Sequence, residues 1–144
     1  MLQKWELTST NGQQFSLTFE TLDMGGTSKT NPVCWDRVEI IDGSNPGIYC
    51  GPDSDGNYYK SDRNKQVTNS DGIANGDGYT AVSIGSSLPH FTSTTNIIVK
   101  FHTTNYGNAN SGFMGVLCCN VQVTATDLTS GEINNLMTVS LTSN

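Results

Sequence analysis

The oxygen-bearing side chains of residues 53–57 are the first feature of the sequence that suggests chemistry. Asp53-Ser54-Asp55-Gly56-Asn57 places side-chain oxygens on alternate residues, so that several of them can face one point. Calcium takes such oxygen ligands, and carboxylates among them raise its affinity. No glutamate follows at the spacing of an EF-hand loop, which excludes that motif. We predict that Asp53 and Asp55 are metal ligands for calcium or sodium, with a plain turn of Asp, Asn and Gly as the alternative.

Four cysteines lie at positions 34, 50, 118 and 119. They form no Cys-x-x-Cys pair, and the chain has only two histidines, so a structural zinc site is not expected. Disulfide use outside the cytosol is the better interpretation. Neighbouring side chains on a strand face opposite ways, and a disulfide between them is rare. For Cys118 and Cys119 we therefore expect buried or free thiols, with linkage to another chain as the alternative.

The sequence offers little support for catalysis. His90 follows Pro89 and His102 follows Phe101, but neither lies in a recognisable catalytic motif. The chain contains no Gly-x-Ser-x-Gly elbow and no His-Glu-x-x-His, and it has only four glutamates for paired-carboxylate chemistry. We predict that the protein is not an enzyme and that both histidines are structural or surface residues.

Aromatic and basic residues close to the Asp-rich turn suggest recognition instead. Tyr58, Tyr59 and Arg63 lie within a few residues of one another. Exposed Tyr and Arg are common anchors of protein interfaces. We predict that these three residues bind a partner, with ordinary loop packing as the alternative.

Strands and turns must position these residues, because apolar side chains alternate with polar ones almost everywhere. Residues 4–24 read as a hairpin around a turn at Asn11-Gly12. Further strands are predicted, in chain order, at 38–41, which ends at Asp42-Gly43, at 97–101 and at 112–123, with weaker candidates at 67, 79–84 and 137–141. Helical signals are poor.

Length and composition agree with one all-β domain. The chain has 144 residues, of which 14% are charged and 35% are hydrophobic. Its net charge of −6 disfavours binding to nucleic acid or to anionic membranes. No apolar run reaches the ~18 residues of a membrane helix, so membrane insertion is not expected. The first residues carry no apolar signal core, so a secreted form would need a signal peptide that precedes this sequence.

Several motifs, taken in order, resemble those of the CUB domain, a module of extracellular proteins. They are Trp5, then Cys34-Trp35-Asp36-Arg37-Val38-Glu39-Ile40-Ile41-Asp42-Gly43, then Cys50-Gly51, and finally Gly112-Phe113. The resemblance runs from about residue 5 to residue 123. It implies a jelly-roll β-sandwich of two antiparallel sheets, which the strand count allows. It also implies a disulfide between Cys34 and Cys50.

The resemblance implies site residues as well. Many CUB domains bind calcium through three acidic residues in loops at one end. The matching positions here are Gly25, Asp36 and Asn105, so one carboxylate and one amide oxygen remain. We therefore predict Asp36 and Asn105 as calcium ligands, with Asp36 capping a turn as the alternative. No other cofactor is expected. Tyr106 lies in a loop where CUB domains often meet partners, and we predict it as a partner-binding residue.

The chain also departs from the CUB pattern. Gln3 occupies the position of the usual first cysteine, and the strands that would precede it are missing. Residues 52–85 read as an Asp- and Gly-rich insertion, of which residues 52–78 are expected to form a long loop or flexible hairpin outside the core. Residues 124–144 form a C-terminal extension, within which we expect Leu136–Thr142 to add a strand at an open sheet edge.

These observations lead to one prediction of function. Residues 1–144 form a single CUB-like domain that is secreted and binds an extracellular protein without catalysis. Lectin-like binding of a glycan is one alternative. A structural role in an extracellular assembly, with self-association through edge strands, is another. Fold can be argued from pattern, whereas this function rests largely on family analogy.

Overall fold

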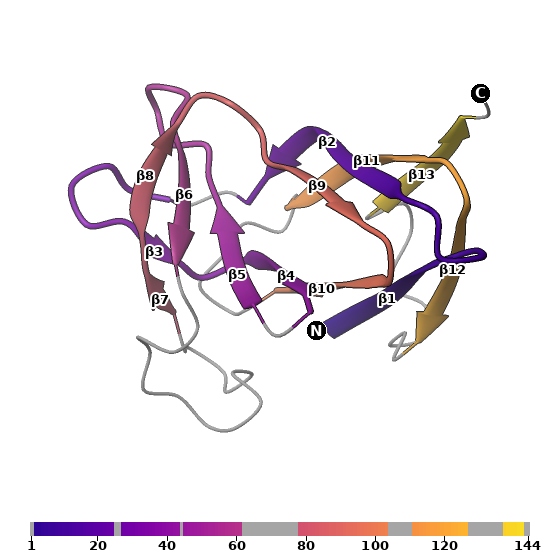
Figure 1. Ribbon diagram of the computed structural model, residues 1–144. Coiled ribbons are helices and arrows are strands. Elements are labelled where there is room, and N and C mark those ends of the chain that lie inside the picture. Colours follow the sequence, from indigo (N-terminus) through magenta and orange to yellow (C-terminus); the bar gives the residue numbers. More distant parts are fainter. Residues whose placement is uncertain are drawn as a thin grey trace.

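A computed structural model describes residues 2–24, 27–43, 45–61, 78–103, 111–126 and 137–142. These residues form an all-β structure (Figure 1). The larger sheet has seven strands, all antiparallel to their neighbours. Their order is β12 (Val121–Thr126), β1 (Leu2–Ser9), β10 (Asn96–His102), β4 (Arg37–Asp42), β5 (Asn45–Cys50), β6 (Tyr58–Ser61) and β8 (Val82–Gly85).

A second sheet of four strands packs against part of the first. Its order is β13 (Met137–Thr142), β11 (Gly112–Cys118), β2 (Phe15–Asp23) and β9 (His90–Ser93). A short third sheet pairs β3 (Val33–Cys34) with β7 (Tyr79–Thr80). The prediction of an all-β sandwich is therefore confirmed, and the third sheet is an addition to it. The described residues include no helix that is long and apolar enough to cross a membrane.

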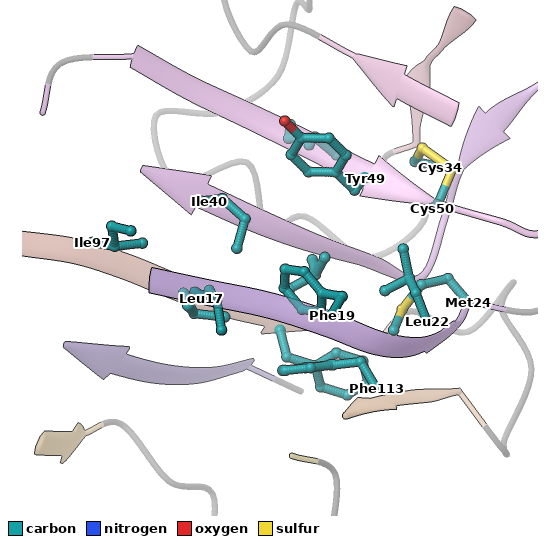
Figure 2. Close-up of a cluster of buried hydrophobic side chains, with 14 of the residues drawn as sticks. Leu17, Phe19, Leu22, Met24, Cys34, Ile40, Tyr49, Cys50, Ile97 and Phe113 are labelled. Carbon is teal, nitrogen blue, oxygen red and sulfur yellow. A yellow bond between two sulfur atoms is a disulfide. The ribbon is translucent and has the colours of Figure 1, made fainter. Parts of the chain in front are cut away.

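The core lies between the two larger sheets, where the alternating side chains predicted from the sequence meet. Leu17, Phe19 and Leu22 of β2 face Ile40, Tyr49 and other side chains of the seven-stranded sheet (Figure 2). Because strand side chains alternate between faces, the polar residues between them remain at the surface: Thr18 and Glu20 are exposed.

Aromatic rings join the two sheets around Phe113 of β11. The Phe113 ring lies 5.7 Å from the Trp5 ring and 5.6 Å from the Phe101 ring, and both belong to the seven-stranded sheet. It also lies 5.6 Å from the Phe19 ring of its own sheet. The pairs with Trp5 and Phe19 are edge-to-face, and the pair with Phe101 is tilted. Edge-to-face pairs add about 0.5–1.5 kcal/mol each to the effect of burial. Phe113 therefore holds the two layers together at the centre.

The predicted hairpin over residues 4–24 is wrong, although its turn is present. Asn11 and Gly12 have φ angles of 57° and 68°, the left-handed conformation that Asn and Gly tolerate best. However, β1 pairs with β10 and β12, whereas β2 pairs with β9 and β11. The turn therefore carries the chain from one sheet to the other. Both strands bury one apolar face, and this pattern does not distinguish pairing within a sheet from packing between sheets.

The long strand predicted over residues 112–123 is divided in two. β11 ends at Cys118 in the four-stranded sheet, and β12 begins at Val121 in the seven-stranded sheet. Asn120 between them has a φ of 57°. Apolar residues lie on both sides of this turn, such as Val116 and Leu117 before it and Val121 and Val123 after it, so the sequence pattern of a strand runs through the turn.

The expectation that residues 52–78 form a long loop or flexible hairpin outside the core is corrected for the part that the structure describes, whereas the weaker strand candidate over residues 79–84 falls on β7 and β8. Residues 58–61 and 82–85 form β6 and β8 of the large sheet. Tyr59, Tyr79 and Ala81 are buried in the core. Gly78 lies so close to β3 that a Cβ there would meet a Val33 side-chain atom at 2.4 Å. Residues 62–77, including the weak strand candidate at Val67, lie outside the described residues.

The C-terminal strand forms as expected. Met137–Thr142 pairs with β11 at the edge of the four-stranded sheet, while Leu136 lies outside the described residues. The pairing is parallel, so this sheet departs from the purely antiparallel arrangement that was predicted. Parallel neighbours need a long crossover, and here the chain passes through β12 of the other sheet before it returns.

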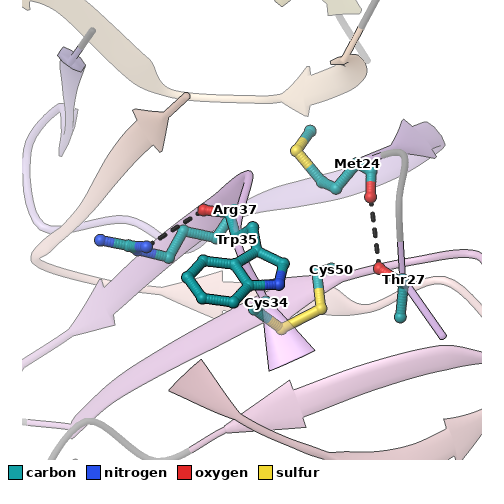
Figure 3. The surroundings of a disulfide bond; sticks show 6 residues. All are labelled: Met24, Thr27, Cys34, Trp35, Arg37 and Cys50. Carbon is teal, nitrogen blue, oxygen red and sulfur yellow. Dashed lines mark hydrogen bonds between the residues drawn. A yellow bond between two sulfur atoms is a disulfide. The ribbon is translucent and has the colours of Figure 1, made fainter. Parts of the chain in front are cut away.

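The predicted disulfide between Cys34 and Cys50 is confirmed (Figure 3). Both cysteines are fully buried, and the bond ties β3 of the small sheet to the end of β5. Close to it, the Thr27 hydroxyl donates a hydrogen bond to the Met24 carbonyl at 3.3 Å. The disulfide therefore holds the small sheet to the large one.

We expect the double variant Cys34→Ala, Cys50→Ala to lose about 3 kcal/mol of unfolding free energy in urea denaturation. The bond closes a loop with a sequence separation of 16, and closing that loop restricts the unfolded chain.

The second disulfide provides the control. Cys118 and Cys119 are also joined, with a sequence separation of 1. Because this loop is minimal, Cys118→Ala, Cys119→Ala should cost less than about 1 kcal/mol by the same loop-closure argument. Equal losses from the two double variants would contradict it.

Candidate functional site

Asp36 lies at the end of the sandwich where β4 begins. Its side chain is buried, and the Ser111 hydroxyl donates a hydrogen bond to its Oδ2 at 2.6 Å. Gln3 is also buried, and its Oε1 has no hydrogen-bond partner. Asn105 and Tyr106, predicted to bind calcium and a partner, lie outside the described residues. Calcium binding by Asp36 and Asn105 stays a prediction.

Asp53 caps the turn that precedes β6. The backbone N–H groups of Asp55 and Asn57 donate to its Oδ1 at 2.8 and 3.0 Å, and the Tyr59 hydroxyl donates to its Oδ2 at 2.5 Å. Asp55 instead points to solvent and pairs with Lys29 at 3.1 Å. This is the turn-capping role that the sequence allowed as the alternative to metal binding. No group of three potential ligands from His, Cys, Asp and Glu occurs among the described residues.

The hydrogen bond between Tyr59 and Asp53 shifts both titrations. It is the main reason why the pKa of Asp53 lies below its usual 3.8, and the backbone N–H groups of Asn57 and Asp55 add to the effect. The same bond raises the pKa of Tyr59 above 10.0, because the ionised phenol could no longer donate it. The hydrogen bond from Tyr59 to Asp53 is therefore strongest between the pKa of Asp53 and the pKa of Tyr59, where Asp53 is ionised and Tyr59 is neutral.

Tyr59 does not belong to an exposed binding surface, which corrects the sequence prediction. It is 4% exposed. Tyr59 is paired with the buried Cys50 on the neighbouring strand, and its hydroxyl donates a hydrogen bond to Asp53. Tyr58, its neighbour, is half-buried and faces Gly85 of β8. Arg63 lies outside the described residues.

Buried polar side chains lie at the paired positions Arg37 of β4 and His102 of β10. Arg37 lies 4.4 Å above the Tyr79 ring and donates a hydrogen bond to the Trp35 carbonyl at 3.1 Å (Figure 3). His102 lies opposite Arg37 on β10, and it is buried as well. His90, by contrast, is exposed, and its Nδ1 lies 2.8 Å from the Thr18 hydroxyl. The two histidines lie on different sheets.

The strand β8 carries exposed aliphatic side chains. Val82 is 69% exposed and Ile84 is 37% exposed, and they are the exposed large hydrophobic residues among those the structure describes. The pairing of β8 with β6 shifts register between Ser83 and Gly85, so Ile84 lies at a local irregularity of the strand. β8 is also the last strand of the seven-stranded sheet, at the opposite end of the molecule from β12 (Figure 1). The only signal in the sequence was the weak strand pattern over residues 79–84.

Cys118 and Cys119 form a disulfide with each other, which corrects the expectation of free thiols or linkage to another chain. The bond lies in the turn between β11 and β12, where the backbone leaves the strand geometry on which that expectation rested. With Cys34–Cys50, it indicates a protein of a compartment other than the reducing cytosol.

A cavity of about 180 Å³ opens beside this second disulfide. Sequence reasoning missed it, because its walls come from three segments that are far apart in the chain and adjacent only in the fold. Its lining includes Gln14, Ser16, Thr92, Cys118, Cys119 and Asn120.

Comparisons with protein-family models, with curated proteins and with solved structures find no match to this chain. The function must therefore be argued from the geometry described above.

We expect Asp53→Asn to reduce thermal stability at neutral pH, since the neutral amide loses the charge-assisted hydrogen bonds from Tyr59 and the turn. Because the pKa of Asp53 is lowered in the folded state, this contribution is present above pH 3.8 and is lost as the pH falls through the folded pKa. Melting temperatures measured by circular dichroism should therefore converge for the two proteins in acid.

Asp23→Asn is the matched control, because Asp23 is an exposed carboxylate at the end of β2. The melting temperature of this variant should stay close to that of the wild type across the same pH series. A gap between wild type and Asp53→Asn that stays constant below pH 3.8 would contradict the role given to the Asp53 carboxylate.

Proposed function

We propose that this chain is an extracellular, non-catalytic binding module that recognises a protein partner along β8. The observation that supports the proposal is the exposure of Val82 and Ile84 on the last strand of the large sheet. An edge strand presents unpaired N–H and C=O groups, and aliphatic side chains on it favour pairing with another chain.

The opposite edge of the same sheet differs in character. β12 ends the sheet on that side, and its exposed residues are the polar Gln122 and Thr124 and the small Ala125. The partly buried Val121 and Val123 pack against the core. Polar exposed residues are one way in which folded proteins protect an edge. Two of the three exposed residues of β8, Val82 and Ile84, are aliphatic, while the third, Ser83, is polar. The aliphatic pair supports a role in association.

The expected mode is the addition of a strand from the partner. In such complexes main-chain hydrogen bonds give affinity, and alternate side chains give specificity. Val82 of β8 lies opposite Lys60 of β6, and Gly85 of β8 lies opposite Tyr58 of β6. A partner segment with apolar residues at alternate positions would place them against the exposed side chains of β8. The partially exposed Tyr58 extends this surface, as the sequence prediction for that residue proposed.

The extracellular setting and the family are part of the same proposal. Two disulfides support a location outside the cytosol, and secretion is the form of it that we propose. The order of motifs from Trp5 to Phe113 supports a CUB-like jelly roll. Lectin-like binding and a structural role in an extracellular assembly are the alternatives that the sequence allows.

The proposal can be tested with short random peptides displayed on phage and selected on the immobilised chain. Selected peptides should share alternating apolar residues. Val82→Lys should weaken their binding roughly tenfold or more, because burying a Val side chain is worth about 1.5–3 kcal/mol and each 1.4 kcal/mol is tenfold. Binding of the synthesised peptides can be measured by fluorescence anisotropy.

Gln122→Lys is the matched control, since it adds the same charge to an exposed residue at the other edge of the sheet. Peptides methylated on alternate backbone nitrogens test the main-chain contacts, and they should bind less tightly than their parents. Equal loss of binding in both lysine variants would overturn the assignment to β8. A wild-type dimer in light scattering that Val82→Lys dissociates would replace the external partner with a second copy of the chain.

A further inference from the structure

The outer face of the four-stranded sheet carries a row of small polar residues that ends at the second disulfide. Ser16 of β2 lies opposite Cys118 of β11 on one side and opposite Thr92 of β9 on the other. The Ser16 hydroxyl donates a hydrogen bond to the Cys118 carbonyl at 3.2 Å. Ser16, Cys118 and Thr92 therefore share one face of the sheet and form the floor of the 180 Å³ cavity.

Two turns form the walls of this cavity. Gln14 comes from the connection between β1 and β2, and Asn120 comes from the connection between β11 and β12. The turns are joined, because the Thr10 N–H donates a hydrogen bond to the Asn120 carbonyl at 2.7 Å. The side chains of Gln14 and Asn120 are exposed, and their amides are therefore accessible to a ligand.

The chemistry of the lining is neutral and hydrogen-bonding. Gln14 and Asn120 each supply an amide with two donors and one acceptor, Thr92 supplies a hydroxyl that can donate and accept, and the Ser16 hydroxyl, which donates to Cys118, can still accept. None of the lining residues carries a charge. A phosphate or carboxylate ligand would call for Arg, Lys or a helix N-terminus, so the cavity does not favour anions.

The disulfide adds a nonpolar component. Cys118 and Cys119 are linked into a single ring, and their sulfur and methylene groups are polarisable and make weak hydrogen bonds at most. The combination of a nonpolar patch with surrounding amides and hydroxyls matches a ligand that has C–H groups on one face and hydroxyls around its rim.

We propose that this cavity binds a neutral monosaccharide unit, either free or at the end of a glycan. Each sugar hydroxyl both donates and accepts, as the amides and hydroxyls of the cavity do, and the C–H face of a pyranose ring would pack against the disulfide. A cavity of about 180 Å³ lined by seven residues suits one sugar ring rather than an oligosaccharide. Such a small, shallow site binds in the millimolar range.

This site is separate from the protein-binding surface proposed on β8. The cavity lies on the four-stranded sheet and its connecting turns, whereas β8 ends the seven-stranded sheet. Variants of Val82 and variants of the cavity therefore share no residue, and either proposal can fail without the other.

Saturation-transfer NMR on the intact, oxidised chain tests the proposal with glucose, galactose, mannose and N-acetylglucosamine as probes. At least one of them should receive saturation, and glucuronic acid should bind more weakly than glucose. Gln14→Ala and Thr92→Ala should each weaken binding roughly two- to tenfold, the effect of losing one hydrogen bond of ordinary strength.

Gln122→Ala and Thr124→Ala are the matched controls, because they remove the same side chains from exposed positions on β12, outside the cavity. All four positions are exposed, so the variants should fold, and circular dichroism verifies that they do. Reduction of the disulfides, or Cys118→Ala with Cys119→Ala, should also weaken binding. No saturation of any neutral sugar would overturn the proposal, and so would equal effects of the cavity variants and their controls.

The methyl glycoside of the best sugar distinguishes the two sources of the ligand. If the site accepts the terminal unit of a glycan, the methyl glycoside should bind as well as the free sugar. If it binds only the free sugar, the glycoside should bind several-fold more weakly. Preferential binding of glucuronic acid would contradict the neutral site in either case.

Discussion

The contact between the two sheets through Phe113 is the constraint on which the rest of the structure depends. Its ring meets Trp5 and Phe101 across the sandwich and Phe19 within its own sheet, at 5.6–5.7 Å. With these rings in place, every strand must turn one face inward, so polar residues of β2 and β9 are directed outward. The sheets differ in width, seven strands against four, so the larger one continues past the smaller. The strand β8 is exposed because it lies in this continuation, beyond the packed region.

Much of the fold could be predicted from local patterns, and the errors have one physical origin. The strands around Phe19, Ile40 and Val99 were found because each has alternating apolar residues. The hairpin over residues 4–24 and the single strand over 112–123 were wrong, because alternation specifies which face of a strand is buried and not which strand lies beside it. Cys34–Cys50 followed from a family resemblance, whereas the pairing of Cys118 with Cys119 ran against the geometry expected of a continuous strand.

The candidate sites show the same limit. Asp53 was predicted as a metal ligand, whereas the partners of its oxygens in the structure are the turn and Tyr59, the role that the sequence allowed as the alternative. Tyr59 could not be placed in the core from sequence, because a Tyr close to Asp and Gly resembles a loop residue. Its burial depends on the hydrogen bond from its hydroxyl to Asp53, which the sequence does not reveal. The exposure of Val82 was equally hidden, since two aliphatic residues at alternate positions usually indicate a buried face.

The cavity beside Cys118 and Cys119 follows from the way in which the chain changes sheets. β1 and β12 are neighbours in the large sheet, and β2 and β11 are neighbours in the small one. The connections β1–β2 and β11–β12 must therefore cross between the sheets side by side, and the hydrogen bond from Thr10 to Asn120 joins them. A hairpin over residues 4–24 would have placed Gln14 elsewhere. The wrong hairpin and the missed cavity therefore have the same cause. Two connections that cross between the sheets at one corner of the sandwich bring amides, hydroxyls and a disulfide to the same place.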